Sequence, residues 1–114
     1  MGKSWIAAIA ESEAQLGADT LARMAKIFID DSSTQLGTIA AALARKELAT
    51  ARGAAHDLVA NAGSMCFAML EGAARECERA CIGGNHTGAL AAYKSLPALV
   101  DICVVLLRDR YNLK

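Results

Sequence analysis

Residues 54–67, AAHDLVANAGSMCF, contain one histidine in a run of helix-forming residues. At about 100° per residue, the apolar side chains of this region gather on the helix face opposite His56. They are Ala51, Ala55, Leu58, Ala62 and Met65. The face around His56 instead carries Arg52, Val59 and four small residues, Ala49, Gly53, Ala60 and Gly63. The sequence therefore predicts a helix over residues 48–64 that is buried on one face and presents His56 to solvent.

Two of the small residues near His56 are glycines, which helices usually avoid. Each interior glycine costs a helix roughly 0.5–1 kcal/mol relative to alanine. Keeping Gly53 and Gly63 beside an exposed histidine suggests that another molecule approaches this backbone closely. Taken alone, the pattern favours a simpler interpretation, an ordinary surface histidine on an alanine-rich helix.

The rest of the chain predicts more helices. Apolar residues at steps of three and four indicate helices over residues 5–15, 20–45, 67–82 and 86–111, with breaks at Gly17 and at residues 83–85. Ser4 and Asp19 are candidate N-caps, and Pro97 should kink or divide the last helix, in which Leu90 faces inward. Short connections favour an all-α fold, an antiparallel up-down four-helix bundle with a short accessory N-terminal helix. We expect residues 1–114 to form one domain.

Charge and composition exclude several classes of function. The formal net charge is zero, whereas a nucleic-acid-binding protein would need a basic stripe. The start of the chain lacks the pattern of a secretory signal, and the apolar runs look too short to span a membrane. We therefore expect a cytoplasmic protein that binds neither nucleic acid nor membrane. A monomer is expected because the helix pattern leaves no apolar face uncovered.

The four cysteines are Cys66, Cys77, Cys81 and Cys103. Cys77 and Cys81 have the i,i+4 spacing that puts two ligands on one helix face, but no matching pair of ligands occurs elsewhere. Disulfides are disfavoured inside the cell, and free cysteine packs well as a small core residue. The sequence thus predicts cysteines in the core and no metal site.

The run from His56 to Met65, together with Leu70 and Glu78, resembles the histidine-containing phosphotransfer (Hpt) domains of bacterial phosphorelays. The matches to the family pattern are Leu58, Ala62, Gly63, Leu70 and Glu78. The plan of an accessory helix, a long helix, the histidine helix and two more also agrees. Three positions depart from the pattern: Val59 replaces the usual lysine, Ala60 the usual first glycine and Cys66 the corner glycine. Cys66 is expected to change the geometry of that corner.

The resemblance implies that His56 accepts a phosphoryl group from a receiver-domain aspartyl phosphate and passes it to another response regulator. It implies that Glu78 can accept a hydrogen bond from the imidazole, although on the sequence alone a solvated carboxylate is an equal alternative. Gln35, a polar residue near the middle of the long helix, is a weaker candidate for the same role. Arg52 could supply the positive charge that the missing lysine would have given. The expected docking residues around His56 are Ala49, Gly53, Val59, Ala60 and Gly63.

The partners implied are the receiver domains of a hybrid sensor kinase and of a response regulator. The chain needs no cofactor of its own, since Mg²⁺ would come with the receiver domain. Without an ATP-binding segment it is a phosphoryl-group carrier and not a kinase by itself. Two alternatives stay open. One is a degenerate relative that docks a receiver without being phosphorylated, and the other is an unrelated helical bundle with a structural or metal-binding role.

Overall fold

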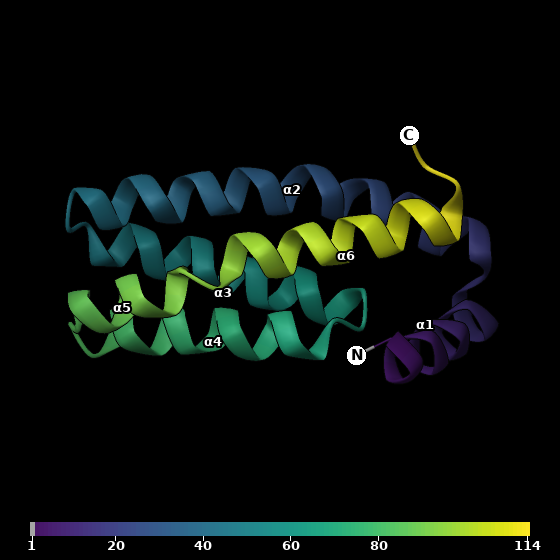
Figure 1. Cartoon of the computed structure of the whole chain (residues 1–114), viewed down its shortest axis with the longest axis horizontal. Helices are drawn as coiled ribbons and strands as arrows, with labels where there is room; N and C mark the ends of the chain where they lie inside the picture. Colours follow the sequence, from purple (N-terminus) through teal and green to yellow (C-terminus); the bar gives the residue numbers. More distant parts are fainter. Residues whose placement is uncertain (1) are drawn as a thin grey trace.

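A computed structural model describes residues 2–114, with side chains described from residue 5 onward. The helices are α1 Gly2–Leu16, α2 Ala18–Ala44, α3 Leu48–Ser64, α4 Ala68–Ile82, α5 His86–Tyr93 and α6 Leu96–Tyr111, and no strand occurs among residues 2–114. In Figure 1, α2, α3, α4 and the α5–α6 segment lie side by side, and α1 lies at the end of the bundle that also holds the C-terminus. The all-α bundle with an accessory helix is confirmed.

The helix that carries His56 spans residues 48–64 as predicted, whereas both predicted N-caps are wrong. The first helix already begins at Gly2, so Ser4 lies inside it. Gly17, with φ 89°, both ends α1 and caps α2, which places Asp19 in the first turn. Glycine adopts this backbone conformation without steric cost, so a single residue can connect the two helices.

The last predicted helix is divided, as the proline suggested. In a continuous helix the N–H of residue 97 would donate to the carbonyl of Tyr93, and proline has no N–H. The chain instead breaks after Tyr93, and α6 starts again at Leu96 with Pro97 in its first turn. In α5, Ala89 is buried and Leu90 is 40% exposed, so the prediction that Leu90 faces inward is wrong.

The corner between α3 and α4 is built around Cys66. Its N–H donates to the carbonyl of Gly63, and the N–H of Phe67 donates to that of Ala62, the two bonds of a Schellman motif. This motif needs a left-handed residue, and Cys66 takes that conformation with φ 65°. The expectation that Cys66 would alter the corner is therefore wrong: the turn keeps its geometry, and the cysteine carries the strain that a glycine would avoid.

The core runs the length of the bundle and is built mainly from alanine, cysteine and aliphatic side chains. The predicted inward face of α3 is fully buried, namely Ala51, Ala55, Leu58, Ala62 and Met65. Ring stacking closes the core at the α1 end, where Trp5 stacks on Phe67 with ring centroids 5.2 Å apart and Phe67 contacts Phe28. As predicted, the cysteines are free; Cys77, Cys81 and Cys103 are buried and Cys66 is half-buried.

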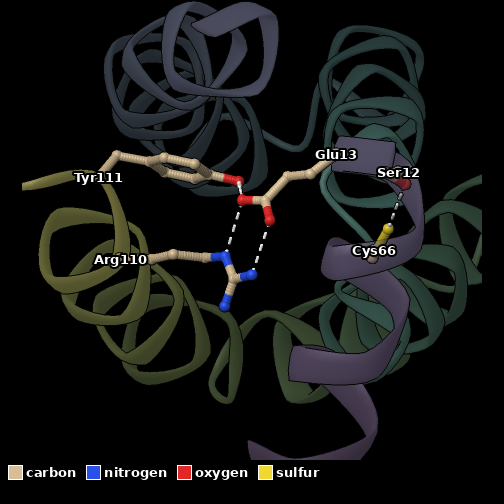
Figure 2. A network of polar contacts seen from close by, with 5 residues as sticks. All are labelled: Ser12, Glu13, Cys66, Arg110 and Tyr111. Carbon is tan, nitrogen blue, oxygen red and sulfur yellow. Dashed lines mark hydrogen bonds and ion pairs between the residues drawn. The ribbon is translucent and has the colours of Figure 1, made fainter. Parts of the chain in front are cut away.

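Helix α1 is fastened to the bundle by polar contacts as well as by stacking. The buried Trp5 indole N–H donates to the carbonyl of Met65 over 2.9 Å. Figure 2 shows the carboxylate of Glu13 between Arg110 and Tyr111, where it accepts two hydrogen bonds from the arginine and one from the tyrosine hydroxyl. These donors lower the pKa of Glu13 to about 2. The first and last helices are thereby joined.

Helix α6 leaves part of its outer face uncovered. Ile102 is 49% exposed and Val105 is 62% exposed, one turn apart on the side away from the core. The stretch His86–Tyr111 is also long and apolar enough to cross a membrane by length and composition, although here it forms two helices that pack on the bundle. Two expectations are therefore wrong. The helices do leave an apolar face uncovered, and one apolar stretch is long enough to span a membrane.

Candidate functional site

His56 lies in the middle of α3 and points to solvent, with 64% of its side chain exposed. The side chain of Glu78, on the adjacent helix α4, is only 12% exposed. His56 Nδ1 and Glu78 Oε2 are 2.8 Å apart, a normal length for a hydrogen bond to a carboxylate. One ring nitrogen is thus held by the protein while the rest of the ring faces outward.

This contact decides which ring nitrogen can react. A carboxylate only accepts hydrogen bonds, so in the neutral imidazole Nδ1 carries the proton and donates a hydrogen bond to Glu78. The lone pair is then on Nε2, the nitrogen without a protein partner among residues 5–114. An exposed imidazole whose tautomer is held by a carboxylate is a nucleophile with a defined direction of attack.

The surface around His56 consists mainly of small residues. Ala49, Gly53, Ala60 and Gly63 are all exposed, as their proposed docking role requires. Val59 is only 7% exposed and belongs to the core cluster, so it offers almost no surface to a partner. Its position about 60° around the helix from His56 places it nearer to the buried face.

The two other polar candidates lie apart from the imidazole contact. Arg52 is exposed, and its side chain makes no ion pair or hydrogen bond with the residues whose side chains are described. Gln35 lines a polar groove between α2 and α3 together with Asp31 and Asp57. Its Oε1 is buried there without a hydrogen-bond partner, so the acceptor that contacts His56 is Glu78 and not Gln35.

One ion pair near this surface was not predicted as part of it. Glu71 and Arg75, one turn apart on α4, form this pair, and both side chains are only partly exposed. A Cβ atom added at Gly63 would lie 3.2 Å from Glu71 Oε1, so the carboxylate of this pair lies directly against the backbone of α3. The signal was available: Glu71, Arg75 and Glu78 are spaced as one helix stripe.

The remaining candidate groups serve the fold. His86 Nε2 donates a hydrogen bond to the carbonyl of Leu43 in the last turn of α2, so this histidine caps that helix end. Burial raises the pKa of the Cys77 thiol to about 11 and that of Cys103 to about 12, which keeps both protonated and unreactive. No group of three or more histidine, cysteine or acidic residues that could hold a metal occurs in the described part of the chain.

A scan against protein-family models matches the Hpt domain over residues 23–110, well over half of the chain. The chain belongs to the Hpt family. The match covers α3 and α4 entirely, and with them the contact between His56 and Glu78. Searches of curated proteins and of solved structures returned no match. Membership gives the general role: an Hpt domain acts in phosphotransfer within a phosphorelay, where it interacts with receiver domains.

Proposed function

We propose that this Hpt domain accepts a phosphoryl group on His56 Nε2 from the aspartyl phosphate of one receiver domain and passes it to a second. The observation that carries the proposal is the 2.8 Å contact between Nδ1 and Glu78, combined with the exposure of the ring. The donor would be the receiver domain of a hybrid sensor kinase and the acceptor that of a response regulator. All three would meet in the cytoplasm.

The reaction follows from the tautomer. The Nε2 lone pair attacks phosphorus, the bond between phosphorus and the aspartyl oxygen breaks, and the electron pair leaves on the aspartate carboxylate. The proton stays on Nδ1, so the ring becomes positively charged as the new bond forms. Glu78 stabilises that charge through the hydrogen bond it already accepts. The return transfer reverses each step.

Docking supplies the rest of the catalytic groups. Ala49, Gly53, Ala60 and Gly63 leave the backbone of α3 open, so a receiver domain can bring its aspartyl phosphate in line with Nε2. Mg²⁺ would be bound by the receiver domain, where it neutralises charge on the phosphoryl group. Arg52, one turn before His56, is the charge-supporting residue that the sequence suggests.

The test is to mix the protein with a phosphorylated receiver domain and to look for acid-labile phosphate on the Hpt chain. We expect a label on the wild-type protein and none on His56→Ala, with His86→Ala labelled normally. Binding without a label would identify a docking module that is not phosphorylated. That alternative is favoured by Val59, which replaces the usual lysine of the family. Neither binding nor label across a panel of receivers would leave a structural role.

A further inference from the structure

The chemistry at His56 creates a demand for positive charge. A phosphoryl group carries up to about two negative charges, and on Nε2 it would be attached to the ring that the Glu78 carboxylate contacts. Because catalysis of phosphoryl transfer is mainly positioning and electrostatic stabilisation, a cation from this chain beside His56 would lower the barrier.

The packing of α3 against α4 places one arginine in this region. Glu78 contacts His56, and Glu71 lies against Gly63. Gly63 comes seven residues after His56 on α3, and Glu71 comes seven residues before Glu78 on α4. The two helices therefore run antiparallel, and the two contacts are in register. Arg75 lies on α4 between the two glutamates, four residues after one and three before the other, so it shares the helix stripe whose members contact α3 at His56 and Gly63.

The current partner of Arg75 holds it only weakly. Arg75 Nη2 and Glu71 Oε2 are 3.0 Å apart, and the two side chains are 43% and 37% exposed. Ion pairs with this exposure contribute little to stability, since water and salt screen them. A phosphoryl group offers the guanidinium two charge-assisted hydrogen bonds at once, which are stronger than a single exposed contact. Arg75 can therefore exchange Glu71 for a phosphoryl group at low cost.

We propose that Arg75 is a phosphate-contacting catalytic residue, which turns from Glu71 towards His56 Nε2 during transfer and stabilises the negative charge on the phosphoryl group. The inference rests on the proposed function of His56. Glu71 is a positioning residue in this scheme, because it keeps the guanidinium beside α3 until the phosphoryl group arrives. Gly63 has a matching role, since a side chain there would push the Glu71 carboxylate away.

The experiment measures transfer from a phosphorylated receiver domain to the full chain in single turnovers, over a range of receiver concentrations. The variants are Arg75→Ala, Arg75→Lys and, as a matched control, Arg79→Ala. Arg79 is an exposed arginine one turn further along α4, and its side chain makes no ion pair within the part of the chain whose side chains are described. Thermal unfolding of each variant checks that the bundle is intact.

We expect Arg75→Ala to lower the maximal transfer rate about tenfold or more, the size of one lost hydrogen bond to a charged group. Arg75→Lys should recover part of the rate, and Arg79→Ala should stay within about twofold of wild type. The concentration of receiver that gives half-maximal rate should change little, because the contact forms with the transferring group.

Three results would overturn the proposal. A transfer rate of Arg75→Ala within twofold of wild type would show that no phosphoryl contact exists. An effect confined to the half-maximal concentration would show that Arg75 only docks the partner. If the wild-type chain itself takes no label from the receiver, the proposed function fails and the role of Arg75 fails with it, a result distinct from the other two.

Discussion

The hydrogen bond between His56 and Glu78 gives the sharpest prediction, because its two proposed contributions can be separated by substitution. Glu78→Gln keeps an oxygen that accepts a hydrogen bond from Nδ1 but removes the negative charge. Glu78→Ala removes both. If the charge stabilises the positive ring that forms as phosphorus bonds to Nε2, the glutamine variant must already be slow, and the alanine variant slower still.

The structure sets the size of the effect. A hydrogen bond to a charged group contributes about 1.5–3 kcal/mol, and the 2.8 Å contact is short enough for the full value. The ring is 64% exposed, so water screens part of the interaction, and we expect about 1–2 kcal/mol to be lost in Glu78→Gln. This corresponds to transfer that is about 5–30 times slower.

The assay is rapid-quench measurement of phosphoryl transfer in both directions, with Glu76→Gln as a control on the exposed face of α4. The charge acts on the phosphorylated ring, so its loss should also shift the equilibrium towards the phosphorylated receiver by a similar factor. A defect of the fold would slow both directions and leave the equilibrium unchanged. Wild-type rates and equilibrium in Glu78→Gln would refute the role of the carboxylate.

Four other predictions follow from the same structure. Arg52→Ala should slow transfer if this arginine supports charge at the phosphoryl group, and an unchanged rate would remove it from the mechanism. Gly63→Leu should reduce transfer while leaving the bundle folded, because it blocks the surface and displaces Glu71; Gly72→Leu, in open space on α4, is the control, and equal rates for both would contradict the open-surface argument. Chemical denaturation should show Cys66→Gly to be neutral or more stable than wild type by up to about 1 kcal/mol, because glycine adopts the left-handed conformation without strain. Cys66→Val should be less stable by about 1 kcal/mol or more, because a β-branched residue fits that conformation badly. The pKa of Glu13 is lowered to about 2, so its contribution to stability is complete above its ordinary pKa near 4.5 and disappears as the pH falls towards 2. The full shift corresponds to about 3.4 kcal/mol, and screening by solvent reduces this. We expect Glu13→Gln to lower the free energy of unfolding by about 1–2 kcal/mol at pH 7 and by little at pH 2.

The fold could be predicted because its signals are local and repeat along the chain. The buried face of α3 follows from helical spacing alone, and the break before α6 follows from the missing N–H of Pro97. The N-caps were misplaced for the opposite reason. Gly17 connects two helices because glycine can adopt a positive φ. Asp19, two residues later, is a good N-cap residue by type, and the spacing of apolar residues does not show which of the two begins the helix.

The candidate site was predictable only in part. His56 and Glu78 were named because the family pattern includes both positions, and the structure places them 2.8 Å apart. Val59 was misassigned, since an angle around one helix does not say which neighbour covers it. The position of the Glu71–Arg75 pair beside α3 was not predicted, because it depends on how α4 is rotated against α3, which no single helix specifies.

The contact between His56 and Glu78 joins two helices that follow each other in the chain, through a corner of only three residues, Met65–Phe67. The polar contacts that fasten α1 to the rest of the bundle join residues 54 to 98 positions apart. Local contacts close small loops, whose entropic cost is low, so they form early in folding, whereas contacts between distant residues form late. The reactive ring and its carboxylate can therefore assemble in an α3–α4 hairpin before the N-terminal helix has found its place.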